Sequence, residues 1–208
     1  MSKFASPVAC LITAGEATAE NYLQKKIEMI NVIEAAVAAG IGMVQVREKA
    51  LPARLLYDLV SGLRTKRADT AILLMVNGRA DIAAAAGADG VHLPSDSIPA
   101  RAVRRSFPDL LIGVSTHSLS EAQAAVSEGA DYVLFGPVFE TPGKGPSKGL
   151  SALAEVCEKL APFPVLALGG IDETNFEKAL SSGASGIAAI RFLNDPNALG
   201  LSGIDFRP

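Results

Sequence analysis

A short formula recurs three times in this chain of 208 residues and restricts the folds that it can adopt. The three copies are Gly87-Ala-Asp89, Gly129-Ala-Asp131 and Gly183-Ala-Ser185, and each is followed at once by a short apolar run. A glycine that ends a helix just before a buried strand is the junction that a repeated helix–strand unit requires. The formula therefore indicates parallel strands that are connected by helices.

The same alternation of short apolar runs and helical segments extends over most of the chain. Eight runs predict strands, at residues 8–13, 43–46, 72–76, 90–93, 110–115, 132–135, 165–168 and 186–190. Eight strands alternating with helices predict the α/β class and, within it, a compact (β/α)8 TIM barrel, whose strands are buried on both faces. A doubly wound sheet is the alternative, but no GxGxxG motif follows the first strand.

The end of the chain departs from the pattern, because residues 194–208 contain no clear amphipathic helix. We expect one domain over residues 1–208, with a barrel at about 8–192 and an irregular tail at 193–208. The eighth outer helix is then short or missing. A homo-oligomer, in which a second subunit covers the barrel at this place, is a further expectation.

The composition excludes several classes of partner. A net charge of −3 gives no overall attraction to nucleic acid or anionic lipid, and aromatic residues make up only 5% of the chain. No apolar run is long enough to span a membrane, and the N-terminus does not resemble a signal peptide. Cys10 and Cys157 lie in apolar patterns, which is typical of buried free thiols in a reducing compartment. We expect a cytoplasmic protein with no membrane and no nucleic-acid partner.

Polar and cationic side chains follow the predicted strands at their carboxyl ends. In a barrel these ends share one rim, and that rim is where ligands bind. Five cations converge there, namely Arg47, Lys49, Arg79, Lys144 and Arg191. Together they predict an anion site, most plausibly for phosphate, although any one of them alone could be a solvated surface charge. The candidate substrate-binding residues are Gln45, Arg47, Lys49, Asn77, Arg79, Ser115, Thr141 and Lys144.

The last two strands suggest where a phosphate group binds. Gly169 and Gly170 follow the seventh strand, and Ile190 and Arg191 end the eighth. Barrels often hold phosphate on backbone N–H groups at this position. We therefore predict phosphate binding by these four residues.

His117, one of only two histidines, stands between the fifth strand and the next helix, beside hydroxyl-bearing residues. An imidazole at a strand end can move protons near neutral pH. The alternative is a loop histidine that serves as a helix cap or a surface polar group. The other histidine, His92, is expected to be structural.

Four segments of the chain resemble the superfamily of thiamine-phosphate synthases and thiazole tautomerases, enzymes of vitamin B1 synthesis with a (β/α)8 fold. They are Val44–Lys49, Gly87–Leu93, Ala130–Pro137 and Leu168–Ile171. The resemblance to the synthase branch implies magnesium held by two aspartates. At these positions the chain has Gly78 and Ser97, with Asp96 adjacent to the second.

Other segments look more like the tautomerase branch, notably residues 77–83, 115–119 and 131–141. The catalytic histidine of that branch matches His117, which the resemblance makes the general acid/base. We therefore expect a thiazole tautomerase-like isomerase that aromatises a thiazole carboxylate phosphate without a metal or other cofactor. Two alternatives stay open. One is a divergent thiamine-phosphate synthase that holds magnesium with Asp96 and substrate phosphates, and the other is a non-catalytic binder of thiamine precursors.

Overall fold

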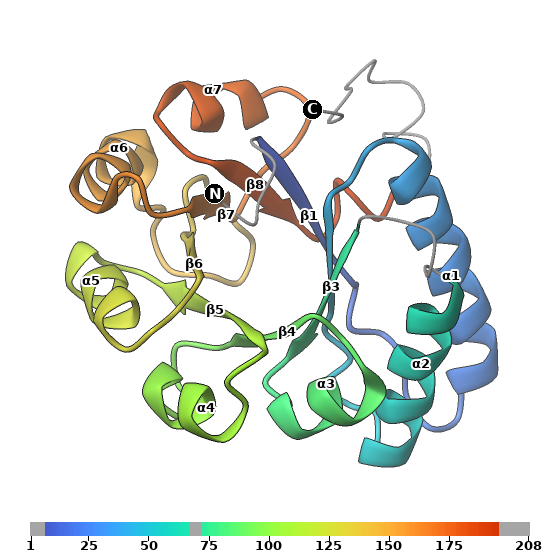
Figure 1. Cartoon of the computed structure of the whole chain (residues 1–208). Helices are drawn as coiled ribbons and strands as arrows, with labels where there is room; N and C mark the ends of the chain where they lie inside the picture. The colour runs from blue at the N-terminus through green and yellow to red at the C-terminus, as the bar shows by residue number, and fades with distance from the viewer. Residues whose placement is uncertain (1–6, 67–71, 196–208) are drawn as a thin grey trace.

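The computed structural model describes residues 7–66 and 72–195 and shows eight parallel strands in a closed barrel, surrounded by helices (Figure 1). The strands are β1 Val8–Ile12, β2 Met43–Val46, β3 Leu73–Asn77, β4 Gly90–Leu93, β5 Leu111–Thr116, β6 Tyr132–Phe135, β7 Val165–Leu168 and β8 Gly186–Ala189. The helices of the described residues are α1 Tyr22–Ala38, α2 Ala53–Lys66, α3 Ala80–Ala86, α4 Ala100–Ser106, α5 Leu119–Ser127, α6 Gly149–Leu160 and α7 Phe176–Ser181.

The predicted TIM barrel is confirmed, because the strands pair in chain order and β8 closes the sheet against β1, with Val8 opposite Gly186. This closure rules out the open, doubly wound sheet. The structure also explains the repeated Gly-Ala-Asp formula. The carboxylate of Asp89 accepts a hydrogen bond from the backbone N–H of Leu74, and Asp131 accepts one from Ile112. In each case the aspartate is hydrogen-bonded to the N-terminal part of the preceding strand, and this bond fixes the junction between the helix and the next strand.

One helix begins earlier than the sequence predicts. The helical spacing of Ile30, Ile33, Ala36 and Val37 predicts a helix that begins at residue 27, whereas α1 begins at Tyr22. Tyr22 is buried against the core, and its hydroxyl donates to the Asp58 carboxylate on α2 at 2.5 Å. Lys26 forms an ion pair with the same carboxylate at 2.7 Å. Contacts with α2 therefore stabilise a first turn that has too few apolar residues to be recognised by periodicity.

The chain beyond β8 makes a single turn within the described residues. The side-chain amide of Asn194 donates to the carbonyl oxygens of Ile12 and Ile190 at 2.7 and 2.6 Å, and Leu193 is buried. Residues 196–208 of the predicted tail lie outside the described residues. The single domain over 1–208 therefore stays a prediction.

The barrel encloses its own core, distinct from the larger one between the strands and the helices. Alternate residues of each strand point inward and fill the barrel, as the two-residue period of a strand requires. Val8, Cys10, Met43, Met75, Leu111, Tyr132 and Leu166 belong to this inner core. Cys157 packs in the outer core, so both cysteines are buried and free, as predicted. Burial raises the pKa of Cys10 to about 12 and that of Cys157 to about 11, which keeps both thiols protonated.

The largest side chain of the inner core depends on a neighbouring glycine. Tyr132 on β6 is fully buried beside Gly113 on β5. A Cβ atom at Gly113 would lie 2.1 Å from Cζ of the Tyr132 ring. The absence of a side chain at Gly113 therefore gives Tyr132 its place inside the barrel.

Candidate active site

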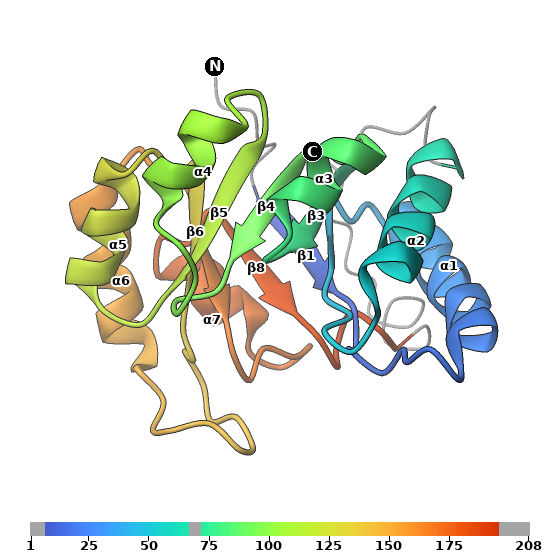
Figure 2. The same cartoon turned by 90° about the horizontal axis from the view of Figure 1, so that it is seen from below.

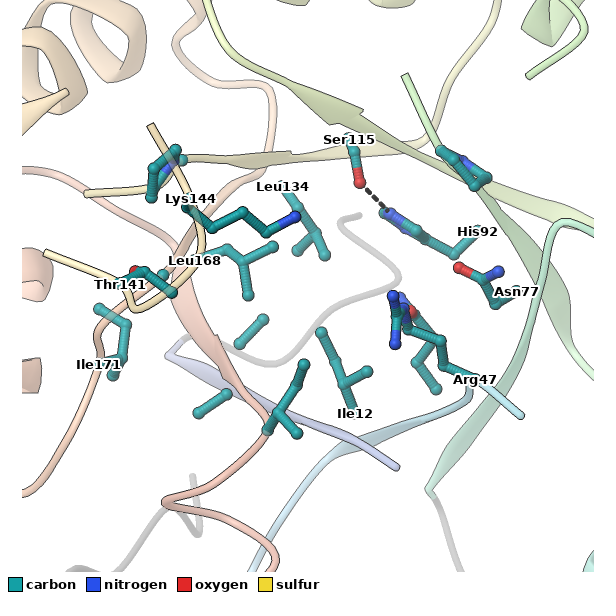
Figure 3. A pocket seen from close by; sticks show the side chains of 18 of the residues that line it. Ile12, Arg47, Asn77, His92, Ser115, Leu134, Thr141, Lys144, Leu168 and Ile171 are labelled. Carbon is teal, nitrogen blue, oxygen red and sulfur yellow. Dashed lines mark hydrogen bonds between the residues drawn. The ribbon is translucent and has the colours of Figure 1, made fainter. Parts of the chain in front are cut away.

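A cavity of about 490 Å³ opens at the carboxyl ends of the strands, and each of the eight strands contributes a side chain or backbone atoms to it. Its floor is divided into a polar and an apolar half (Figure 3). Strands β2 to β5 provide the polar half, which consists of Gln45, Asn77, His92 and Ser115. Strands β6 to β8 and β1 provide the apolar half, which consists of Leu134, Leu168, Ala188 and Ile12. Such a floor suits a flat ring that has polar atoms along one edge.

The upper wall of the cavity is strongly cationic. Arg47, Lys49, Lys144 and Arg191 line it, and none of the four forms an ion pair with another described residue. Asp96 is the one acidic side chain among the described residues that line the cavity. Cations that form no ion pair within the described residues, in a chain of net charge −3, are suited to binding an anion.

Lys144 reaches this wall from the loop between β6 and α6. Figure 2 shows this loop projecting beyond the barrel on the side to which the strands point. Thr141, in the same loop, also lines the cavity, and its hydroxyl donates to the carbonyl oxygen of Phe139 at 3.0 Å. The loop therefore forms a wall over the apolar half of the floor.

The fifth predicted cation, Arg79, is not part of the cavity. Its guanidinium donates two hydrogen bonds to the Asp81 carboxylate, Nε to Oδ1 at 2.9 Å and Nη2 to Oδ2 at 2.6 Å. The ion pair is largely exposed, and it lowers the pKa of Asp81. The prediction that Arg79 binds substrate is therefore corrected, because an acidic residue two positions along the chain holds its side chain.

The predicted phosphate-binding residues do lie together at the cavity. Gly169 and Gly170 have φ angles of +98° and +65°. A Cβ atom on Gly169 would lie 2.6 Å from Pro137 Cα, so the β6–α6 loop can pack there only against glycine. Within the described residues, no hydrogen bond uses the backbone N–H groups of these two glycines, although both carbonyl oxygens are bonded. These N–H groups, beside Arg191, are available to an anion.

His117 lies at the rim, where its ring is held by one backbone contact. Its Nδ1 is 2.5 Å from the carbonyl oxygen of Gly136, which can only accept, so Nδ1 carries the proton. In the neutral ring Nε2 is then an acceptor. His117 is not the helix cap. The next residue, Ser118, caps α5, because its hydroxyl accepts a hydrogen bond from the backbone N–H of Glu121.

The polar half of the floor contains two buried groups, of which the sequence predicted Gln45 as substrate-binding but gave no role at the site to His92. His92, expected to be structural, lines the cavity, and its Nε2 is 2.8 Å from Oγ of Ser115. Burial lowers the pKa of His92 to about 3, so the ring is neutral. Nε2 of Gln45 is buried without a hydrogen-bond partner among the described residues. A buried amide of this kind normally has a partner, which here would be a bound ligand.

Glu48, between two predicted cations, has a supporting role that the sequence did not reveal. Its buried carboxylate accepts hydrogen bonds from the backbone N–H groups of Gly15 at 3.1 Å and Ala17 at 2.8 Å. A Cβ atom on Gly15 would lie 3.3 Å from Nη1 of Arg47. Glu48 therefore holds the β1–α1 loop against the Arg47 guanidinium.

A metal site made only of protein ligands is absent from the part of the chain that the structure describes. No group of three His, Cys, Asp or Glu side chains there could hold an ion. Asp96 nevertheless lines the cavity beside the anion site. Magnesium is often held by one carboxylate together with substrate phosphates, and the residues present fit that reduced form.

The chain is similar to proteins of one family over nearly its whole length. The thiamine monophosphate synthase family matches residues 10–193. A putative thiamine-phosphate synthase from Geobacter sulfurreducens is 44% identical over 82% of this chain and 82% of its own length. Putative thiamine-phosphate synthase 2 from Aquifex aeolicus is 40% identical over 86% of this chain and 93% of its own length. The structure of thiamine phosphate pyrophosphorylase from Pyrococcus furiosus superposes with a TM-score of 0.82 at 30% identity, covering 97% of this chain and 93% of that one.

These similarities correct the functional prediction. The thiazole tautomerase assignment, and with it the isomerase class, is wrong, because the relatives at 40–44% identity are named as synthases.

Within the described residues no helix has the length and hydropathy of a membrane span. The chain belongs to the thiamine monophosphate synthase family.

Proposed function

We propose that this protein is a thiamine-phosphate synthase, a transferase that joins a pyrimidine diphosphate to a thiazole phosphate. The observation that carries the proposal is the cavity itself, in which a divided floor for a ring lies below four cations that form no ion pair with another described residue. In the reaction, the bond between the pyrimidine's methylene carbon and the diphosphate oxygen breaks. The thiazole nitrogen supplies the electron pair for the new bond to that carbon, and diphosphate leaves.

The divided floor fits the pyrimidine. The apolar side chains of Ile12 and Leu134 offer contact to a ring face, while Gln45 and Ser115 offer hydrogen-bonding groups to its edge. The unpartnered Nε2 of Gln45 gains an acceptor when the ring binds. Binding therefore relieves the cost of a buried polar group that has no partner.

The cations act on the leaving group. Negative charge grows on the diphosphate as its bond to carbon breaks, and donors already in place stabilise that charge most effectively. Arg47, Lys49 and Lys144 are the side chains that we assign to this task. The thiazole phosphate is assigned to the N–H groups of Gly169 and Gly170 and to the Ile190–Arg191 segment. Magnesium, when bound through Asp96 and the diphosphate, would supply further neutralising charge there.

Replacing Asp96 with asparagine is expected to raise the magnesium concentration for half-maximal rate by about tenfold or more, because one charged ligand is lost. Magnesium titrations of the condensation rate measure this change. Asp109→Asn is the matched control, since Asp109 lies in the turn before β5, outside the cavity. An unchanged magnesium requirement in Asp96→Asn would show that Asp96 does not bind magnesium.

Condensation gives His117 no proton to transfer, because the attacking thiazole nitrogen uses a lone pair. We therefore propose that His117 contacts substrate without acting as an acid or base. His117→Asn, whose amide can still donate to the Gly136 carbonyl, is expected to reduce kcat by less than about tenfold, well below the loss typical of a general acid/base. Steady-state kinetics measure the effect. A loss of a thousandfold would show that proton transfer by His117 is required.

The proposal is tested by incubating the purified chain with both precursors and magnesium and measuring thiamine phosphate after oxidation to its fluorescent thiochrome. Continuous turnover that requires both precursors is expected. Binding of both precursors without product would instead identify a silent binder.

The remaining expectations concern the cellular location and the oligomeric state of the enzyme. We propose a cytoplasmic location, which agrees with the two buried free thiols. A homo-oligomer stays a prediction, and sedimentation equilibrium measures it directly.

A further inference from the structure

We propose that Asn194 is a positioning residue that leaves the backbone N–H of Arg191 available to a phosphate group at the rim of the cavity. Its side chain takes the place of that N–H in the hydrogen-bond ladder between β1 and β8. The effect of Asn194 on turnover rests on the proposed synthase function, whereas the structural basis of the proposal does not.

The hydrogen bonds between β1 and β8 recur at every second residue. The two strands lie side by side where the barrel closes (Figure 1), and Val8 is paired with Gly186 and Cys10 with Ala188. The backbone N–H of Val8 donates to the carbonyl oxygen of Ser185 at 3.0 Å. In a parallel ladder a residue donates to the residue before its partner and accepts from the residue after it. Every second residue of β1, starting from Val8, therefore bonds β8.

This ladder stops one pair short of the rim of the cavity. Continued in the same way, it would pair Ile12 with Ile190, and the Ile12 carbonyl oxygen would accept from the N–H of Arg191. The pairing between the two strands instead ends at Leu11 and Ala189. The Arg191 N–H forms no hydrogen bond with another described residue. The last carbonyl oxygen of β1 therefore needs a different donor.

Asn194 supplies that donor. Its side-chain Nδ2 is 2.7 Å from the carbonyl oxygen of Ile12 and 2.6 Å from that of Ile190. Both oxygens can only accept, so the amide nitrogen and not the amide oxygen faces them. The two amide protons join the ends of β1 and β8 at the place where the ladder stops. The Ile12 carbonyl is thereby satisfied without the N–H of Arg191.

The orientation of the peptide between Ile190 and Arg191 follows from the same contacts. Its carbonyl oxygen accepts from Nδ2 and also from the backbone N–H of Asn194, the latter at 3.1 Å. Because a trans peptide is planar, the N–H of Arg191 points in the opposite direction, away from Asn194. Ile190 and Arg191 both line the cavity, and Asn194 does not. The unbonded N–H therefore lies at the rim of the cavity.

The turn that carries Asn194 is anchored in the outer core. Phe192 and Leu193 are buried, and the Phe192 ring is stacked at 6.4 Å from the Phe176 ring of α7. The amide of Asn194 is therefore held in place before a ligand binds. A donor that is already ordered does not lose binding free energy to ordering.

The N–H of Arg191 completes a set of three backbone donors at neighbouring strand ends. The other two are the N–H groups of Gly169 and Gly170, which follow β7, the strand next to β8. Hydrogen bonds from backbone N–H groups to a charged phosphate oxygen are stronger than those to a neutral acceptor. The ligand that such a set takes is a phosphate monoester, which in the proposed reaction is the thiazole phosphate.

The first test follows the Arg191 amide of the wild-type protein in ¹H–¹⁵N NMR spectra, with inorganic phosphate as the probe. Without phosphate, this amide should exchange with solvent at least about tenfold faster than the amide of Ala189 in the ladder. Phosphate should shift its resonance together with those of Gly169 and Gly170. A slowly exchanging Arg191 amide without phosphate, or a resonance that saturating phosphate leaves in place, would overturn the proposal.

The second test is the steady-state kinetics of Asn194→Ala. Without the amide, the N–H of Arg191 can bond the Ile12 carbonyl and no longer serves the phosphate group. The KM for the thiazole phosphate should rise by about 10- to 100-fold, the loss expected for one hydrogen bond to a charged group. With saturating thiazole phosphate, kcat/KM for the pyrimidine diphosphate should stay within about threefold. Equal losses for the two substrates would mean that Asn194 only maintains the fold.

Asn194→Asp has nearly the same shape but places an acceptor against both carbonyl oxygens. It should therefore raise the KM for the thiazole phosphate at least as much as Asn194→Ala does. A KM equal to that of the wild-type protein would show that the donated hydrogen bonds have no role in binding.

Asn21→Ala is the matched control. Asn21 is also half-buried, and its side-chain amide donates to a backbone carbonyl oxygen, that of Glu16, at 3.1 Å and outside the cavity. This variant should lower the unfolding temperature without changing either KM. If the wild-type protein condenses nothing, the synthase function fails. The amide spectra still decide the role of Asn194, so the two failures are distinguishable.

Discussion

Replacing Arg47 with glutamine is expected to reduce kcat/KM for the pyrimidine diphosphate by about 100- to 1,000-fold, the loss typical of one donor to a charged transition state. Arg47 lines the cavity without an acidic partner among the described residues, and Glu48 and Gly15 hold its surroundings in place. Because the negative charge on diphosphate increases as the bond breaks, kcat should fall as well as affinity. Steady-state kinetics with saturating thiazole phosphate measure both parameters.

Arg79→Gln is the matched control for this experiment. Arg79 is the same residue type at the end of the next strand, but Asp81 holds its guanidinium away from the cavity. This variant should keep kcat/KM within about twofold, since exposed ion pairs contribute little. Equal losses in the two variants would show that general electrostatic attraction, rather than a placed guanidinium, explains the role of Arg47.

Replacing Gly113 with alanine is expected to destabilise the protein by about 3 kcal/mol, the upper part of the usual cost of overpacking a core. The new methyl group would lie 2.1 Å from Cζ of the Tyr132 ring, which is fully buried. The unfolding temperature should fall by about 6–12 °C, measured by circular dichroism. Displacement of Tyr132 should also weaken its hydrogen bond to His92.

Gly42→Ala is the control for the loss of a glycine. Gly42 precedes β2, and a Cβ atom there has nothing within 4 Å. The unfolding temperature of this variant should stay within about 2 °C of wild type, because Gly42 is only half-buried and the space around the new methyl group is open. A similar small change in Gly113→Ala would mean that the inner core can relax around Tyr132.

Most of the barrel could be predicted from the sequence because its unit repeats. Short apolar runs that follow Gly-Ala-Asp junctions identify β4 and β6 from the local pattern alone. The start of α1 could not be predicted, since Tyr22 is held by the distant Asp58. Periodicity records local pattern, and this turn depends on a contact across 36 residues.

The candidate site could be predicted in outline, because strand ends in a barrel must converge. That rule placed Arg47 and Lys144 correctly at the cavity. It failed for Arg79, since it cannot tell whether a nearby acid such as Asp81 will bind the side chain first. It also gave no sign of the contact between Tyr132 and His92, which depends on the space left by Gly113.

The branch of the family was misassigned for a physical reason. Gly78 and Ser97 stand where the resemblance to the synthase branch implies magnesium-binding aspartates, and this difference favours the tautomerase branch only if both aspartates are essential. A diphosphate can instead be held mainly by cations, and four of them line this cavity with Asp96. A histidine at a strand end is compatible with several reactions, so His117 alone does not distinguish the two branches.

The most direct test of the transferase function is the stoichiometry of diphosphate release, followed by ³¹P NMR with both precursors and magnesium. We expect one diphosphate for each thiamine phosphate formed, and no diphosphate release above the uncatalysed rate when the thiazole phosphate is omitted. Diphosphate release without thiamine phosphate, or no release with both precursors present, would contradict the assignment of this cavity to pyrimidine transfer.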